Sequence, residues 1–191
     1  MNPLISRAIE VLNNDGVCAI PTDTVYGLAA DATNIYALKK ISKIKKRPIE
    51  KKYVIAVGSI EKALELVASP EQVLPYFKKY WPGEMTFICK KKENLTLPFL
   101  EETIAIRIPN NSLTKKLLNQ HENPIALTSI NISGQQEIIN YKEISKQIND
   151  QLDYVLPYEG KLSGVTSTIV DLTSVSPKIL RQGLCSFNQK K

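Results

Sequence analysis

Hydroxyl and carboxylate side chains gather at the point where a short apolar run ends. Residues 17–20 read as a buried strand, and Pro21 stops it before residues 22–26, which include two threonines, an aspartate and a tyrosine. Ligands of α/β folds gather outside the carboxyl ends of strands. The pattern therefore predicts a binding edge that recognises its ligand through hydrogen bonds.

Two further groups of residues are suited to an anionic ligand. Lys45 and Arg47 end a predicted helix just before Pro48, which forces the preceding residue out of the helical region. Residues 129–134 (SINISG) follow a predicted strand, and such a loop can hold phosphate oxygens with its N–H and O–H groups. The alternatives are a solvated cation cluster at a helix C-terminus and a simple Asx or Ser turn.

Arginine is rare in this chain, because only four of the 25 basic residues are arginines. Where lysine is the usual cation, an arginine can mark a place that needs a planar, bidentate donor for carboxylate or phosphate. Arg107 and Arg181 each follow an apolar strand, and Arg47 precedes a proline. A structural salt bridge is the alternative for Arg107 and for Arg181.

Several classes of site are excluded by spacing and count. The eight glycines fit neither the dinucleotide-binding G-x-G-x-x-G pattern nor the P-loop. The single histidine, His121, lies at a predicted helix end, where we expect it to be exposed and uninvolved. Three distant cysteines exclude a disulfide framework and a cysteine-rich zinc site. Whatever the site does, we expect it to act by positioning and electrostatics rather than by histidine acid–base chemistry.

Helical and strand patterns alternate along the chain and predict one α/β domain over residues 1–191, with a mixed sheet covered by helices. We expect helices over 3–14, 35–45, 60–68, 70–79, 112–120 and 141–149. We expect strands over 17–20, 53–57, 85–89, 103–108, 125–128, 168–172 and 178–181, and near Tyr154.

Composition is that of an ordinary globular protein, with 43% hydrophobic and 23% charged residues among 191. No run approaches the ~20 apolar residues that a membrane span needs, and the first residues lack a secretory signal. The odd cysteine count suits a reducing cytoplasm. A net charge of +6 fits a nucleotide or an RNA as partner, although a lysine-rich surface is also simply soluble.

Taken in order, these motifs resemble the threonylcarbamoyl-AMP synthase family, of the YrdC or TsaC type. The resemblance extends from Pro21 to Gly183 and implies a twisted mixed sheet, flanked by helices, with a central basic cleft. Its motifs are PTDTVYG at 21–27, K-x-R-P at 45–48, W-P-G-x-x-T at 81–86, R-x-P at 107–109, T-S-x-N-x-S-G at 128–134, STIVD at 167–171 and R-x-G at 181–183.

The resemblance implies synthesis of threonylcarbamoyl-adenylate and pyrophosphate from L-threonine, bicarbonate and ATP, the first step of a tRNA modification beside the anticodon. It places the catalytic and nucleotide-binding tetrad on Lys45, Arg47, Ser129 and Asn131. Beyond the tetrad, it places ATP contacts on Thr103 and Arg181, and threonine contacts on Thr24, Arg107 and Ser167. Mg²⁺ is expected to enter with ATP, without a protein metal site.

The chain departs from the family pattern at a few positions. Glu84 stands where proline is usual, Ile130 where alanine is usual, and Ala29 where glycine is common. Lys52 and Tyr53 replace a usual Pro-Leu pair after Lys51, so the resemblance does not predict the exact shape of the amino-acid end of the cleft. The chain looks like the short, single-domain form, and companion segments typical of hydrogenase maturation proteins are absent.

The alternative interpretation is a double-stranded RNA or tRNA-binding module without catalysis. Aromatic residues are not interleaved with the lysines in an RNA-binding pattern, which counts against it. For the enzyme we expect only weak, salt-dependent tRNA contact from scattered lysines, and a separate transferase complex that receives the adenylate.

Overall fold

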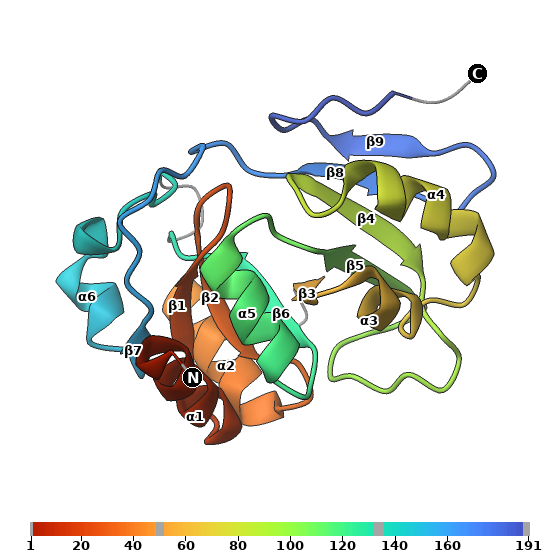
Figure 1. Ribbon diagram of the computed structural model, residues 1–191. Coiled ribbons are helices and arrows are strands. Elements are labelled where there is room, and N and C mark those ends of the chain that lie inside the picture. The colour runs from red at the N-terminus through yellow and green to blue at the C-terminus, as the bar shows by residue number, and fades with distance from the viewer. Residues whose placement is uncertain (1, 49–51, 132–135, 189–191) are drawn as a thin grey trace.

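The computed structural model describes residues 2–48, 52–131 and 136–188. Within these residues, nine strands form one continuous sheet with the order β7-β1-β2-β6-β3-β5-β4-β8-β9 (Figure 1). The strands are β1 (Cys18–Pro21), β2 (Tyr26–Asp31), β3 (Val54–Ala56), β4 (Met85–Lys90), β5 (Thr103–Arg107), β6 (Ile125–Ser129), β7 (Tyr154–Val155), β8 (Thr168–Asp171) and β9 (Lys178–Arg181).

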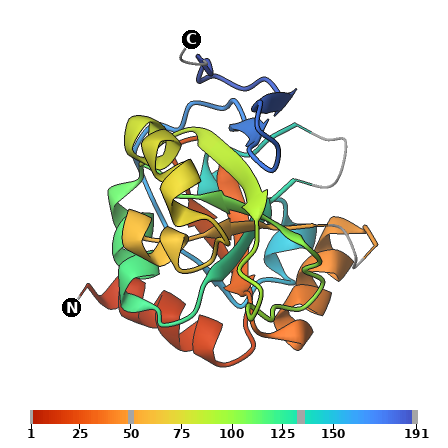
Figure 2. The same cartoon turned by 90° about the vertical axis from the view of Figure 1, so that its right-hand side faces the viewer.

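The helices surround this sheet, and the C-terminal strands lie at the end of the molecule away from α1 (Figures 1 and 2). The described helices are α1 (Pro3–Asn13), α2 (Ile35–Lys45), α3 (Ile60–Leu64), α4 (Pro70–Tyr80), α5 (Ser112–Gln120), the 3₁₀ turn η1 (Tyr141–Glu143) and α6 (Lys146–Asn149).

The prediction of a mixed sheet is confirmed. Three neighbouring pairs, β1–β7, β3–β5 and β4–β8, are parallel, and the other described pairs are antiparallel. Parallel strands need long crossover connections, whereas antiparallel strands can be joined by short turns. The short connections account for the antiparallel pairs of consecutive strands, β1–β2 and β8–β9, whereas β6 pairs with β2 and β3 across long stretches of sequence.

Helix ends follow the capping residues. The side chain of Asn34 accepts hydrogen bonds from the backbone N–H groups of Tyr36 and Ala37, which fixes the start of α2. Asn111 caps α5 in the same way, through Leu113 and Thr114. The bounds predicted for these two helices are confirmed at both ends.

Other predicted bounds are wrong, and β2 was not predicted at all. The helix expected over 60–68 ends at Leu64, and the helix expected over 141–149 is divided into η1 and α6. Every residue of β2 is buried, so it lacks the polar–apolar alternation of a half-buried strand. It also follows directly on the polar tract, which hid it from a reading based on periodicity.

The prediction that His121 is exposed and uninvolved is wrong as well. His121 is 1% exposed, and its Nε2 lies 3.2 Å from Oδ2 of Asp31. Burial alone would raise the pKa of Asp31, but hydrogen bonds from His121, Thr33 and Asn123 outweigh burial and hold that pKa well below its usual range. The group ties the end of β2 to the loop between α5 and β6.

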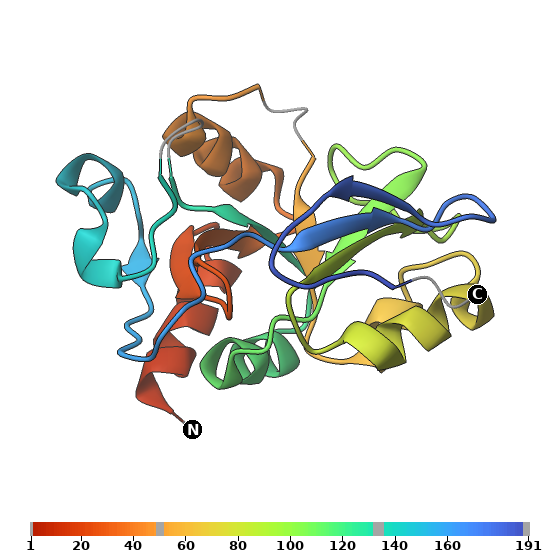
Figure 3. The ribbon, with the colours of Figure 1, turned by 90° about the horizontal axis from the view of Figure 1, so that it is seen from above.

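The two faces of the sheet are covered by different helices. One apolar cluster packs α1 and α5 against residues such as Ile20 and Ile125. The other packs α2, α3 and α4 against residues such as Leu28, Ile55 and Phe87. Figure 3 shows α2 (orange) on one side of the sheet and α1 and α5 (red and green) on the other.

The face that carries α1 and α5 continues across the rest of the sheet. Leu127 of β6 lies opposite Val54 of β3. Val54 in turn lies opposite Ala105 of β5, two residues before Arg107. Because side chains alternate between faces, Arg107 points the same way, as do Thr86 of β4 and its partner Ile169 of β8. Apart from Ala105, these residues form the floor of the cavity described next.

Candidate active site

A cavity of about 240 Å³ lies on this face of the sheet. Its described lining combines the floor of the sheet with the polar tract after β1 and the loop before β8. The lining residues are Thr22, Thr24, Val25, Gly27, Arg47, Lys52, Val54, Thr86, Arg107, Leu127, Thr128, Ser129, Thr166, Ser167, Ile169 and Arg181.

The charge of this lining is one-sided. Of the described residues that line the cavity, four are cationic and none is acidic: Arg47, Lys52, Arg107 and Arg181. Hydroxyl groups of threonine and serine stand between the cations. A concave surface with several cations and hydroxyls is suited to a ligand that carries phosphate or carboxylate groups.

Arg47 reaches the cavity from the end of α2. Its Nη1 lies 3.4 Å from Oγ1 of Thr128, whereas Nε and Nη2 are buried without a hydrogen-bond partner among the described residues. A buried donor that lacks a partner costs about 1–3 kcal/mol. The guanidinium is therefore ready to donate to an oxyanion in the cavity.

Lys45, Ser129 and Asn131 come together as the sequence predicted. The Lys45 ammonium donates to the Ser129 carbonyl at 2.7 Å, to Oδ1 of Asn131 at 3.0 Å and to the Asn131 carbonyl. Oγ of Ser129 in turn donates to Oδ1 of Asn131 at 2.6 Å. Lys45 is only 3% exposed, so in this state it holds the turn that follows β6 instead of facing the cavity.

Burial first, and then the nearby charge of Arg47, lower the pKa of Lys45 to about 8, while Glu137 acts in the opposite direction. The ammonium is therefore close to losing its proton in mildly alkaline solution. A neutral amine has fewer hydrogens to donate than the carbonyl and amide oxygens of Ser129 and Asn131 now accept.

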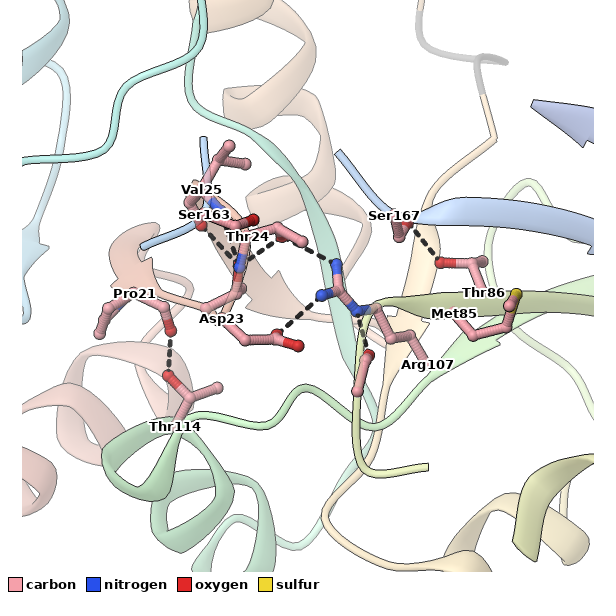
Figure 4. Close-up of polar contacts among 12 residues, drawn as sticks. Pro21, Asp23, Thr24, Val25, Met85, Thr86, Arg107, Thr114, Ser163 and Ser167 are labelled. Carbon is pink, nitrogen blue, oxygen red and sulfur yellow. Dashed lines mark hydrogen bonds and ion pairs between the residues drawn. The ribbon is translucent and has the colours of Figure 1, made fainter. Parts of the chain in front are cut away.

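Arg107 is the centre of a buried polar network (Figure 4). Its Nη2 donates to Oδ1 of Asp23 at 2.7 Å, Nη1 to Oγ1 of Thr24 at 3.0 Å and Nε to the Gly83 carbonyl at 3.0 Å. Burial lowers the pKa of Arg107, and the charges of Asp23 and Glu84 oppose this effect. The salt bridge that was the alternative for Arg107 exists, and Arg107 lines the cavity as well.

Ser167 joins two sides of the cavity. Its Oγ lies 2.8 Å from Oγ1 of Thr86 in the floor, and its carbonyl accepts from Nε and Nη2 of Arg181 at 3.1 and 2.9 Å. The alternative of a salt bridge for Arg181 finds no carboxylate within the described chain. Arg181 instead fixes the loop before β8 while it lines the cavity.

Six of the nine predicted site residues line the cavity, namely Thr24, Arg47, Arg107, Ser129, Ser167 and Arg181. Lys45 and Asn131 lie behind it, bonded to Ser129. Thr103 is at the far end of β5, where its Oγ1 lies 3.5 Å from Nζ of Lys52. Ser133 and Gly134 lie outside the described residues.

Several lining residues were given no role by sequence reasoning. Lys52, Thr86 and Thr128 belong to this group. Most of them lie within or beside the quoted motifs, so proximity to a motif was the available signal. Lys52 had been noted only as a departure from the family pattern.

The described residues form neither a metal-binding cluster nor a membrane-spanning helix. Among residues 2–48, 52–131 and 136–188, no group of three or more His, Cys, Asp or Glu residues is placed to hold a metal ion. Over the same ranges, no helix is both long and apolar enough to cross a bilayer.

Comparison with known proteins identifies the relatives of this chain. The threonylcarbamoyl-AMP synthase of Pyrococcus abyssi is 34% identical over 183 residues, which cover 94% of this chain and 54% of that protein. The synthase of Aliivibrio fischeri is 30% identical over 185 residues, which cover 94% of this chain and 98% of that protein. This chain thus spans about half the length of some curated relatives and nearly all of another.

Solved structures agree with the sequence matches. P. abyssi Sua5 complexed with L-threonine superposes with a TM-score of 0.86 at 32% identity, covering 94% of this chain and 54% of that one. Escherichia coli YciO superposes with a TM-score of 0.88 at 25% identity, covering 97% and 92%.

A family model described as "Telomere recombination", which groups Sua5, YciO and YrdC, matches residues 10–183. This range contains all the residues that line the cavity. With the relatives at 30% identity or more, the match shows that the chain belongs to the Sua5/YciO/YrdC family.

Proposed function

We propose that this protein makes L-threonylcarbamoyl-adenylate from L-threonine, bicarbonate and ATP and releases pyrophosphate. The observation that carries the proposal is the cavity, in which four cations and several hydroxyls converge around guanidinium donors of Arg47 that have no partner among the described residues. The relatives named threonylcarbamoyl-AMP synthase, and the relative solved with L-threonine, support the choice of substrates.

In the proposed reaction, the threonine amine attacks bicarbonate, and a carbamate forms with loss of water. A carbamate oxygen then attacks the α-phosphorus of ATP, and the bond to the β-phosphate breaks as pyrophosphate leaves. Such a displacement depends on positioning and on neutralising charge on the phosphoryl oxygens. We propose that Arg47 and Arg181 neutralise that charge and that Lys45 holds Ser129 and Asn131 beside the phosphates, a role supported by its hydrogen bonds to both residues.

The amino acid is proposed to bind at the other end of the cavity. Arg107, with Thr24 bonded to its Nη1, would take the threonine carboxylate, and Ser167 would bind a polar group of the amino acid. We also propose that Thr103 lies near the nucleotide, because its Oγ1 contacts Nζ of Lys52 and Lys52 lines the cavity. The described lining offers no carboxylate, so Mg²⁺ is proposed to arrive bound to ATP phosphates and water.

We also propose that the protein acts as a single domain that makes only weak contact with tRNA. The nine described strands share one sheet, which supports action as a single domain. We propose a cytoplasmic location, transfer of the adenylate to a separate tRNA-modifying complex, and only weak contact with tRNA. The exposed lysines of the described helices, such as Lys39, Lys40, Lys78 and Lys79, are spread over different elements.

The first prediction is that the purified protein releases pyrophosphate from ATP only when both threonine and bicarbonate are present. The reason is that the attacking carbamate does not exist unless both are supplied. A coupled phosphate assay, with each substrate omitted in turn and no RNA added, measures this dependence. ADP formation without threonine would contradict adenylation, and a strict requirement for tRNA would favour the RNA-binding alternative.

The second prediction is that ATP affinity falls above pH 8. The pKa of Lys45 is lowered to about 8, so its positive charge is present below that pH and lost above it. If only the ammonium form supports binding, the Kd for ATP rises about tenfold for each further pH unit. Calorimetric titrations with Mg·ATP between pH 7 and 9.5, without threonine, measure this rise.

The Lys45→Met variant is the control for the pH dependence. It cannot titrate, so we expect weaker ATP binding at every pH and a nearly flat profile over the same range. A wild-type profile that is equally flat would show that the charge of Lys45 does not contribute to binding.

A further inference from the structure

Tyr53 lies directly beneath the guanidinium of Arg47. Cζ of Arg47 is 4.8 Å from the centroid of the Tyr53 ring, well within the range of a cation–π interaction. Tyr53 is 7% exposed and belongs to the main apolar cluster. Its ring is therefore a desolvated surface on which the arginine rests.

The ring is itself fixed to α2, the helix that ends just before Arg47. The Tyr53 hydroxyl donates to the Leu38 carbonyl at 3.2 Å and lies 3.1 Å from Oγ of Ser42. The carbonyl of Ser42 also accepts a hydrogen bond from the backbone N–H of Arg47 at 3.1 Å. Ser42 thus links the tyrosine and the arginine backbone, so both ends of the Arg47 side chain have defined positions.

The hydrogen-bonding groups of Arg47 are largely unused within the described protein. Its Nη1 has one long contact with Thr128, while Nε and Nη2 are buried and without a partner. A cation stacked on an aromatic face keeps its in-plane N–H groups available to an oxyanion. An arginine held in this way loses less conformational entropy when the ligand binds.

We propose that Tyr53 is a positioning residue that holds Arg47 ready for a phosphate group of the nucleotide. The inference rests on the proposed function, and it concerns a residue that none of the sequence motifs includes. The aromatic face of Tyr53, and not only its apolar volume, contributes to nucleotide affinity in this proposal. A residue that merely fills the core would contribute to stability alone.

The test compares Tyr53→Phe with Tyr53→Leu by calorimetric titration with a non-hydrolysable ATP analogue. Phenylalanine keeps the ring and loses the hydroxyl, so we expect affinity within about twofold of wild type and a lower unfolding temperature. Leucine removes the ring, so we expect affinity to fall about 3- to 30-fold. In steady-state assays the loss should appear mainly in KM for ATP, because binding is the step affected.

Two controls separate the proposed role from general damage. Tyr36 lies on α2, is 65% exposed and has Nζ of Lys39 5.9 Å from its ring centroid, outside the cavity. Tyr36→Leu should therefore leave nucleotide affinity unchanged. In an Arg47→Ala background, Tyr53→Leu should add less than about a twofold effect, because the partner of the ring is gone.

Equal affinity of the Tyr53→Phe and Tyr53→Leu proteins would overturn the proposal, and so would a full effect of Tyr53→Leu in the Arg47→Ala background. If Tyr53→Leu does not fold, Tyr53→Met serves as the ringless variant under the same criteria. Inorganic triphosphate is titrated in parallel. Wild-type protein that binds triphosphate but releases no pyrophosphate would contradict the proposed function and leave the role of Tyr53 testable.

Discussion

Replacing Arg47 with lysine is expected to lower turnover by roughly 30- to 1,000-fold, because a charge-assisted contact worth about 2–4 kcal/mol is lost. Lysine keeps the positive charge, but it lacks the planar set of donors that Nε and Nη2 provide in this buried position. It also cannot stack on Tyr53 in the same manner. Steady-state pyrophosphate release at saturating substrates measures the change.

The matched controls are Lys39→Arg and Lys40→Arg on the exposed side of α2. Both substitutions exchange the same two side chains in the reverse direction, and both should leave turnover at the wild-type level. A mild and equal effect at all three positions would mean that Arg47 is an ordinary surface residue. An Arg47→Lys protein with normal turnover would remove the main support for a phosphate contact at this site.

Replacing Asp23 with alanine is expected to destabilise the fold by about 3–5 kcal/mol, because it leaves the buried charge of Arg107 without its counterion. The ion pair is 2.7 Å long, and both side chains are largely buried. For a protein of this size the midpoint of thermal unfolding should fall by roughly 6–20 °C. Calorimetry or circular dichroism on the purified variant measures the shift.

A surface ion pair of similar length provides the comparison. Arg7 and Glu10 are 2.8 Å apart, but both side chains are more than half exposed. Glu10→Ala should therefore leave the unfolding midpoint essentially where it is. The double variant Asp23→Leu, Arg107→Met should be more stable than Asp23→Ala, because no buried charge remains. If Asp23→Ala were as stable as wild type, water would have to reach Arg107, and the site would be wetter than the structure indicates.

Sequence alone predicted the elements whose ends are fixed locally. Both ends of α2 and α5 were predicted correctly, and their starts are fixed locally because Asn34 and Asn111 cap the first turns with their side chains. The strand β2 was missed because the contacts that define it come largely from residues distant in sequence. Its residues are buried on both faces by neighbours that are distant in sequence, and no periodicity within the strand records this.

The candidate site shows the same division. Motif order predicted that Lys45, Ser129 and Asn131 meet, and they do. It did not predict that Lys45 would be buried behind the cavity, since the depth of a side chain depends on how α2 packs on β2 and the rest of the sheet. The role of His121 was predicted wrongly for a related reason. Its partner Asp31 lies 90 positions away, and no local pattern links the two.

The floor of the cavity consists of side chains from five adjacent strands, β6, β3, β5, β4 and β8. Hydrogen-bonded strands are held about 4.8 Å apart. The spacing of the floor side chains is therefore fixed by the spacing of the strands. The floor cannot widen for a larger ligand unless hydrogen bonds of the sheet break. Redesign of the cavity for another ligand belongs in residues 22–25 and 166–167, where loops can change length and shape while the strand spacing of the floor stays the same.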